Sequence, residues 1–390
     1  MPRSLVIGAG INGILTAKAL QNNGFDVDIL DCEPQSGMRA TFANGCQLSF
    51  SHTTPMNIQP SFFSKPFCKP FFLPEEQKNW LLQHRRSKIN FEQRFSLLTE
   101  LALESKQAFD KIFKKYSNLP VGIGHSSGTA YIFSRKSQFE WRKNFFEKQK
   151  NKYNIHYKCF DTKESIECDD AFVNAGGVQG LIFTPLDKTL NAIAFTKFME
   201  NEFLNDGGRV FYNTSATEIQ HNNGIVSTVQ TNTGMYSNYD FYIYTGGAFG
   251  LNLLQDFNLN LQPVTGYSLT FDVSYSNYCP QVNVIDFTNK VVYSRHEDIL
   301  RVAGFFDLLP PKNKEKRIKM LYSTAVKTFP ILKRQKLIHT WFESRVFTYN
   351  EEPVVQKISE NFIINTAHGH LGITLSAGSA SKIASLLLSN

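Results

Sequence analysis

The N-terminal segment, residues 1–31, constrains the fold more than any other part of the sequence. Residues 4–8 form a short apolar run typical of a buried parallel strand, and the spacing of apolar residues over 11–23 predicts a helix. Gly24 is placed to end that helix, and residues 25–31 alternate as a second strand does. The pattern predicts a β-α-β unit with a right-handed crossover.

Three glycines mark the turn between this strand and helix. Gly8, Gly10 and Gly13 have the spacing GxGxxG, and Asp31 ends the second strand. Gly8 permits a tight turn, Gly10 lets the backbone approach a pyrophosphate, and Gly13 lets helix and strand pack closely. The helix N-terminus offers free N–H groups to phosphates. The segment therefore predicts a dinucleotide site in which Asp31 binds ribose hydroxyls and disfavours a 2′-phosphate.

The glycine motif alone does not separate FAD from NAD. Near the other end of the chain, residues 368–372 (HGHLG) form a loop that enters a helix of small residues. The start of such a helix would suit the pyrimidine edge of a flavin, because its partial positive charge stabilises negative charge on the reduced ring. A tightly packed C-terminal helix without a ligand is the alternative.

Length and composition indicate a globular chain. It has 390 residues, 42% hydrophobic and 19% charged, which is enough for two domains or one large domain with an insertion. We find no apolar run of the roughly 18 residues that span a bilayer, and no signal peptide. Six cysteines without CxxC spacing favour a reducing compartment and argue against a zinc site or a disulfide framework. We expect a cytoplasmic protein without a metal site.

The net charge of +7 has its main source in residues 135–153. The simplest interpretation of this basic stretch is a solvated helix face, and an anionic membrane surface or a nucleic acid are the alternatives. We expect no DNA partner, and the stretch permits a peripheral association with the inner face of the cell membrane. The sequence does not predict an oligomeric state.

Five segments resemble the D-amino acid dehydrogenase branch of the D-amino acid oxidase-like (DAO) flavoproteins, and the similarity extends over nearly the full length. They are residues 6–34, which resemble the family's FAD-binding opening, and TFANGCQLSFSHTTP (41–55), PVTGYSLT (263–270), ILRVAGFFD (299–307) and NTAHGHLGITLSAGSA (365–380). The resemblance implies an α/β fold: a Rossmann-like FAD-binding domain with a β-rich (α+β) substrate domain packed over the flavin. It implies non-covalent FAD and oxidation of an amine next to a carboxylate.

The order of predicted elements divides the chain into two discontinuous domains. We assign the FAD-binding domain to residues 1–75, 165–255 and 340–390, and the substrate domain to residues 76–164 and 256–339. Carried over residue by residue, the resemblance implies that the flavin is contacted by Gly8, Gly10, Ile11, Asn12, Gly13, Asp31, Cys32, Thr41, Asn44, Gly45, Thr217, Gly246, Gly247, His368, Gly369, Leu371, Gly372, Ile373 and Thr374.

Arg345 falls on the family arginine that holds the substrate carboxylate, a task suited to the planar guanidinium. A surface ion pair is the alternative. Its surroundings depart from the family pattern, because Glu343, Val346, Tyr349, Asn350, Glu351 and Gln356 replace Gly, Pro, Pro, Asp, Gly and Gly. On a strand, Glu343 would share a face with Arg345 and could pair with it.

Three further residues have candidate roles. Tyr267 would donate its hydroxyl to the substrate carboxylate, unless it is an interior tyrosine with a satisfied hydroxyl. His52 would lie over the flavin ring, unless it is a loop histidine near solvent. Cys46 is either a redox thiol or, as we favour, a small buried residue.

These observations predict an FAD-dependent oxidoreductase that acts on the Cα–N bond of a small amino acid. The substrate α-hydrogen would leave as a hydride to flavin N5. D-Amino acids are the first candidates, and secondary amines of the proline or glycine type come second. A quinone is the expected electron acceptor. Two alternatives stay open: an FAD enzyme that acts on an amino-acid-like modification of tRNA, and a flavin-binding protein without turnover.

Overall fold

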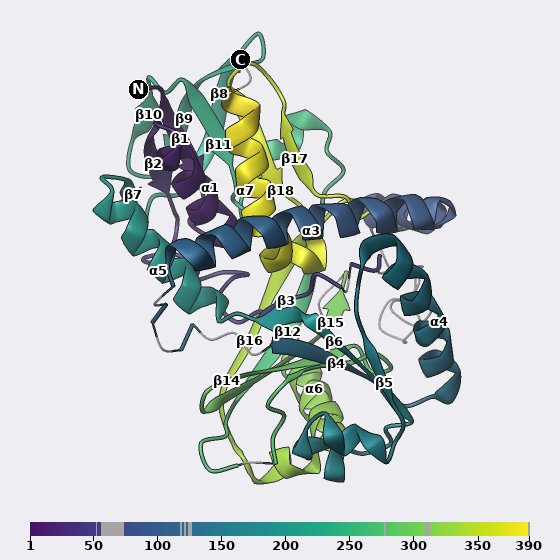
Figure 1. The fold of residues 1–390 in the computed structure, drawn as a ribbon. Coiled ribbons are helices and arrows are strands. Elements are labelled where there is room, and N and C mark those ends of the chain that lie inside the picture. The colour runs from purple at the N-terminus through teal and green to yellow at the C-terminus, as the bar shows by residue number, and fades with distance from the viewer. Residues whose placement is uncertain are drawn as a thin grey trace.

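A computed structural model describes residues 1–51, 53–55, 74–117, 119–120, 122–123, 127–276, 278–308 and 313–388. It contains two large sheets, one in each half of the molecule, and the long helix α3 (Phe91–Lys115) runs across the molecule between them (Figure 1). The two sheets confirm the predicted fold class, an α/β part combined with a β-rich part.

The first large sheet has six strands and contains the predicted β-α-β unit. In spatial order its strands are β17 (Val354–Lys357), β18 (Phe362–Thr366), β11 (Phe241–Tyr244), β1 (Arg3–Ile7), β2 (Asp26–Leu30) and β7 (Arg209–Phe211). Neighbouring strands are parallel except for β17 and β18. Because parallel strands place their carboxyl ends at one edge, the loops that follow β1, β11 and β18 meet there.

Helices pack around this sheet and share one apolar core. They are α1 (Ile11–Asn22), α3, α5 (Ala192–Asn205) and α7 (Gly372–Leu388). With the turn before it, α7 spans 20 residues and contains an 18-residue window of mean hydropathy 1.4, which by length and composition would suffice to cross a membrane. The sequence analysis did not detect this run. More than half of it is buried, and it packs on α1 and α3 as a core helix does.

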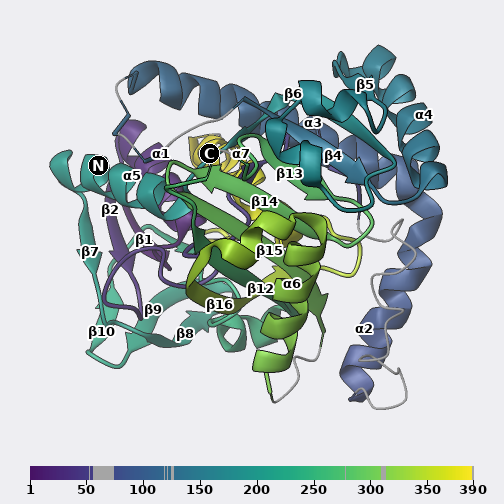
Figure 2. The same cartoon turned by 90° about the horizontal axis from the view of Figure 1, so that it is seen from below.

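The second large sheet has nine mixed strands. Their spatial order is β16 (Lys336–Phe347), β12 (Gln262–Asp272), β15 (Ile299–Asp307), β14 (Val291–His296), β13 (Asn283–Asp286), β4 (Ser127–Phe133), β6 (Gly180–Thr189) and β3 (Gln47–Leu48), and β5 (Lys158–Phe160) pairs with β6. Helix α6 (Glu315–Thr328) packs on β12 and β15 (Figure 2).

The remaining elements lie around these two sheets. Helix α2 (Glu75–Arg86) precedes α3, and α4 (Lys136–Tyr153) follows β4. A small antiparallel sheet contains β8 (Ala216–Asn222), β9 (Ile225–Thr231) and β10 (Met235–Ser237). Strands β6 and β16 belong to the nine-stranded sheet, although most of their residues fall in segments assigned from the sequence to the FAD-binding domain. Strand pairing joins residues far apart in the chain, so a local pattern does not reveal it.

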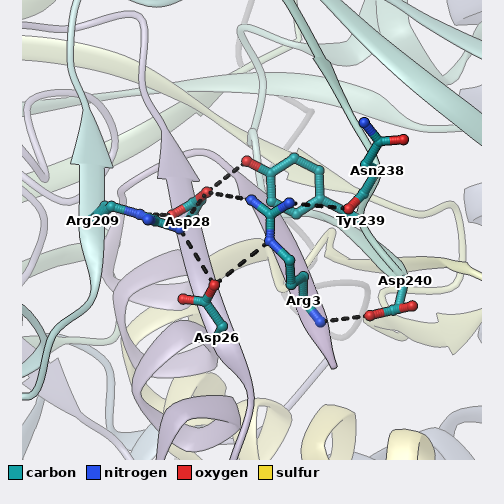
Figure 3. Close-up of polar contacts among 7 residues, drawn as sticks. All are labelled: Arg3, Asp26, Asp28, Arg209, Asn238, Tyr239 and Asp240. Carbon is teal, nitrogen blue, oxygen red and sulfur yellow. Dashed lines mark hydrogen bonds and ion pairs between the residues drawn. The ribbon is translucent and has the colours of Figure 1, made fainter. Parts of the chain in front are cut away.

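A buried carboxylate ties together the amino-terminal ends of the six-stranded sheet (Figure 3). Asp28 on β2 accepts hydrogen bonds from Arg209 Nε on β7 at 2.6 Å and from the Tyr239 hydroxyl at 2.6 Å. Arg3 on β1 lies 3.7 Å from the same carboxylate, and its guanidinium stacks on the Tyr239 ring. This cluster lies at the edge opposite the loops that build the site.

Candidate active site

A cavity of about 230 Å³ lies between the carboxyl edge of the six-stranded sheet and the nine-stranded sheet. Both halves contribute to its wall. Twelve of the residues proposed from the sequence line it: Ile11, Asn12, Thr41, Asn44, Gly45, Gly247, Arg345, His368, Gly369, Leu371, Gly372 and Ile373. The fold therefore brings together segments from the beginning, middle and end of the chain.

The three glycines of the first turn have different reasons to be glycine. Gly8 has φ +111°, and a Cβ there would lie 3.0 Å from the backbone of Thr245. A Cβ on Gly13 would lie 1.8 Å from the Gly8 carbonyl oxygen, so the helix could not pack on the strand. Gly10 has an ordinary extended backbone, and the nearest atom to its Cβ would be the Thr41 hydroxyl at 3.5 Å. Neither the backbone conformation nor a neighbouring protein atom requires glycine at this position, which fits a glycine that leaves room for a ligand.

Asp31 holds the glycine loop in place. Its carboxylate accepts the N–H of Ala9 at 2.5 Å and the N–H of Glu33 at 2.8 Å. Burial raises the pKa of Asp31, and the two N–H groups oppose that rise. Asp31 and its half-buried neighbour Cys32 lie outside the cavity wall, and the contact of Asp31 with a ribose stays a prediction.

Two buried polar atoms on residues of the cavity wall have no hydrogen-bond partner in the described part of the chain. They are Oδ1 of Asn12, in the first turn of α1, and Nε2 of Gln47 on β3. Buried polar groups are nearly always hydrogen-bonded, so such atoms indicate a missing partner. FAD is rich in polar groups, and the space beside Gly10 together with these atoms fits that cofactor.

The C-terminal loop makes a sharp turn before α7. Ala367 and Gly369 both have positive φ, and a Cβ on Gly369 would lie 2.6 Å from the Phe347 ring. His368 is buried, and its Nε2 lies 2.9 Å from the Ser379 hydroxyl. The turn places Gly372, the first residue of α7, in the cavity wall. The helix N-terminus is therefore at the cavity, as predicted from the sequence.

Other proposed residues lie elsewhere. The Thr374 hydroxyl accepts the Ser49 N–H at 3.0 Å and so anchors the loop after β3. Gly246 packs against the Tyr244 ring. Thr217, at the start of β8, lines a separate groove. His52 lies outside the described residues.

Arg345 projects into the cavity from β16. The described residues form no hydrogen bond or ion pair with its guanidinium, which lies 4.9 Å from the centroid of the Phe306 ring. Burial lowers its pKa to about 10, so it remains a cation at neutral pH. A buried cation without a counterion is costly, which points to an anion as its partner.

Glu343 shares the face of β16 with Arg345, as the strand period predicts, since both line one small cavity beside β12. The pairing between them that the strand pattern allowed is not formed among the described residues. The Glu343 carboxylate lies 3.6 Å from Arg39, and its other oxygen accepts the Ser344 N–H. Arg345 is therefore available to a ligand.

The structure contradicts the role predicted for Tyr267. Its hydroxyl donates to the Asp307 carboxylate at 2.8 Å, and the side chain is 1% exposed. Asp307 also accepts hydrogen bonds from Arg317. Because its proton is committed to Asp307, Tyr267 is the interior tyrosine of the alternative interpretation.

The sequence analysis missed three titratable residues in the cavity wall, His370, Lys290 and Asp286. His370 lies within the loop motif that the analysis used, yet it was not proposed. Burial and, to a smaller extent, the charge of Arg345 lower its pKa to about 4. Lys290 lies in the turn between β13 and β14, and no local pattern singles it out.

Cys46 is buried and lines the cavity. Burial opposes ionisation of its thiol, but His296 and Arg301 outweigh this effect and lower its pKa to about 7. The thiol is therefore buried, as we favoured, and also ionisable.

The family model described as FAD dependent oxidoreductase (DAO) matches residues 3–386. A D-amino acid dehydrogenase of Neisseria gonorrhoeae is 29% identical over 405 residues, covering 98% of this chain and 94% of the relative. One from Vibrio atlanticus is 25% identical over 417 residues, covering 98% and 95%.

Two solved structures share the fold over the whole chain. The glycine oxidase of Bacillus cereus has a TM-score of 0.79 at 18% identity, covering 100% of this chain and 95% of that one. The L-proline dehydrogenase of P. horikoshii has a TM-score of 0.73 at 15% identity, covering 100% and 93%.

Proposed function

The chain belongs to the DAO family of FAD-dependent oxidoreductases, and from this premise we propose that it oxidises the Cα–N bond of a small amino acid. A D-amino acid is the first candidate, in keeping with the relatives named D-amino acid dehydrogenase. A secondary amine of the proline or glycine type is the second, in keeping with the solved structures of similar fold.

The observation that carries this proposal is Arg345 in the cavity wall without a protein counterion. An α-amino acid carries a carboxylate next to the reacting carbon. A guanidinium grips a carboxylate with two parallel hydrogen bonds and so fixes its orientation. Phe306 beneath the guanidinium and Gly266 beside it define the side from which the carboxylate enters.

The chain's own residues would hold the cofactor and orient the substrate. The N-terminus of α1, with Gly10 and Asn12, would hold the pyrophosphate of FAD, and the N-terminus of α7 would face the flavin ring. FAD, when bound, supplies the acceptor for the hydride that leaves Cα. Arg345 would hold the substrate by its carboxylate and so orient its Cα hydrogen.

The proposal is tested by mixing purified protein under anaerobic conditions with free D-amino acids, proline, sarcosine and glycine. Loss of the flavin colour with a free amino acid supports it. Loss of the flavin colour only with tRNA from a modification-deficient strain would support the alternative of a tRNA-modifying enzyme. No loss with either would make the protein a flavin binder without turnover.

Variants at Arg345 test the role assigned to it. Arg345→Ala removes a charge-assisted contact, and hydrogen bonds of this kind contribute roughly 1.5–3 kcal/mol each, so catalytic efficiency should fall by about two to four orders of magnitude. Arg345→Lys should recover only part of the loss because a point charge lacks the fork geometry. Glu343→Gln, which leaves Arg345 in place, is the matched control. Wild-type efficiency in Arg345→Ala would reject the carboxylate assignment.

A further inference from the structure

Lys290 places an amine in the cavity wall that the mechanism above does not use. It lies in the turn between β13 and β14 and has φ +60°. Its Nζ lies 3.7 Å from the centroid of the Phe287 ring, which lines the same cavity. The described residues form no hydrogen bond or ion pair with this Nζ.

The nearest carboxylate is already satisfied by other groups. Asp286 on β13 accepts the backbone N–H of Asn289 at 2.9 Å, the Asn289 side-chain amide at 2.8 Å and the Thr328 hydroxyl at 3.1 Å. It is 1% exposed and contributes to the cavity wall. Asp286 therefore attracts the Lys290 ammonium from a distance without pairing with it.

Arg142 and Arg345 are the cations in the surroundings of Lys290. Arg142 on α4 is fully buried among the rings of Tyr131, Phe145, Phe146 and Phe287. Arg345 and His370 also line this cavity, and His370 is neutral at pH 7 because its pKa is about 4. Burial is the main cause that lowers the pKa of Lys290 to about 7; the charge of Arg142 acts in the same direction, and Asp286 opposes the shift. A large fraction of Lys290 is therefore neutral at physiological pH and able to take up a proton.

The proposed reaction needs such a group. A free amino acid carries an ammonium at neutral pH, and its nitrogen must have a lone pair before the Cα hydrogen can leave as a hydride. The proton therefore needs an acceptor within reach of the substrate nitrogen.

We propose that Lys290 is the base that accepts the proton from the substrate ammonium, a role that rests on the proposed function. One N–H bond of the substrate breaks and one N–H bond forms on Lys290, and no electrons change hands in this step. Two electrons and the Cα hydrogen then leave together as hydride. The product imine forms with Lys290 as the ammonium, which returns its proton to solvent when product leaves.

The sheet places Lys290 and Arg345 on opposite sides of the substrate position. Arg345 lies on β16 and Lys290 directly before β14, with β12 and β15 between them. Three strand spacings separate the backbones by about 14 Å, and both side chains extend into one cavity. A substrate held at Arg345 thus lies in the space that Lys290 also faces.

The test is the pH dependence of anaerobic flavin reduction by an amino acid that the wild-type protein oxidises. In the wild type the rate should fall on the acid side with a midpoint near pH 7. In Lys290→Met the rate at pH 7 should drop by about 10²-fold or more, and the midpoint should move toward the pKa of the substrate ammonium. Methylamine in solution should restore part of the rate. Lys319→Met, at an exposed lysine on α6, is the control and should match the wild type.

The variant Lys290→Arg tests whether Lys290 acts as a base or only supplies a positive charge. It keeps the positive charge but cannot accept a proton at these pH values, so it should be as slow as Lys290→Met. Full rate in Lys290→Arg, or an unchanged pH profile in Lys290→Met, would overturn the inference and make Lys290 a binding site for an anionic group. A second readout does not depend on turnover: labelling of Lys290 by acetic anhydride should have a midpoint near pH 7, and a midpoint above pH 10 would also overturn it.

Failure of this inference is distinguishable from failure of the proposed function. A wild-type protein that no amino acid reduces overturns both. A wild-type protein that is reduced, together with an unchanged Lys290→Met variant, overturns only the role of Lys290.

Discussion

A Cβ atom on Gly266 would lie 2.8 Å from the nearest guanidinium nitrogen of Arg345 and 3.2 Å from its Cζ. Gly266 is on β12 and Arg345 on the neighbouring strand β16. No positive φ requires glycine at this position. Gly266 is therefore the residue that leaves room for the guanidinium in the cavity.

Gly266→Ala should displace the guanidinium and lower catalytic efficiency by about 10²-fold, since misplacement by about 1 Å has an effect of that size. FAD content should not change. Kinetics of both single variants and of Gly266→Ala combined with Arg345→Ala would measure the coupling between them. If the two losses are additive, Gly266 does not act through Arg345.

Gly10 and Gly13 should respond differently to a side chain. Gly10→Val should give a folded but colourless protein, because a Cβ there would meet only the Thr41 hydroxyl, at 3.5 Å, and the side chain would occupy the expected pyrophosphate position. Gly13→Ala should instead destabilise the fold, since its Cβ would collide with the Gly8 carbonyl. Flavin absorbance per mole of protein and thermal melting separate the two effects. A yellow Gly10→Val protein would contradict the assignment.

Asp28 should contribute far more stability than its neighbour Asp26. Asp28→Asn puts an amide donor against the donors of Arg209, Tyr239 and Arg3 in a buried site (Figure 3). We expect a loss of about 3 kcal/mol in the free energy of unfolding, at the lower end for a broken buried pair because Arg209 is half-exposed. Asp26→Asn, at a partly exposed pair, should lose about 1 kcal/mol or less. Urea unfolding of both variants checks this, and equal losses would refute it.

His368 should make the protein less stable in mild acid. Burial lowers its pKa to about 4, below the ordinary 6.5, so between these values the unfolded chain binds a proton that the folded chain does not. Stability should therefore fall as pH drops from 6.5 to 4, by up to about 1.4 kcal/mol per pH unit for this group. In His368→Gln this component should vanish. Urea midpoints of both proteins at pH 7 and pH 5 measure it, and identical pH dependence would show that His368 is not its source.

The basic helix α4 should bind anionic membranes weakly. Lys143, Lys148, Lys150 and Lys152 are exposed on it, whereas Arg142 from the same stretch is buried. We expect the protein to bind anionic liposomes, with an affinity that falls as the salt concentration rises. We also expect the reduced flavin to be reoxidised faster by a quinone than by oxygen. Lys148→Glu with Lys150→Glu should weaken liposome binding, and Lys319→Glu on α6 should not. Rapid peroxide production without liposome binding at low salt would exclude this expectation.

Local patterns in the sequence determined the part of the site that we expect to hold the cofactor. The strand and helix periods of residues 4–31 predict β1, α1 and β2, and the glycine spacing follows from turns and close packing within that short segment. The loop before α7 is predicted in the same way, because the turn and the helix that follows it are adjacent in the chain. Arg345 was located by a resemblance of motifs, which does not depend on its neighbours in space.

Only the tertiary structure decided what surrounds the substrate position. Tyr267 lies in the best-matched motif, yet its hydroxyl is committed to Asp307 on a neighbouring strand. Glu343 pairs with Arg39 from the other end of the chain. Lys290 has no sequence signal, because its burial and its place in the cavity arise when the turn between β13 and β14 is brought beside β15 and α4. The hydrogen-bond partners and pKa values of the residues around the substrate position depend on contacts between distant segments of the chain. The periodicity of a single segment does not predict such contacts.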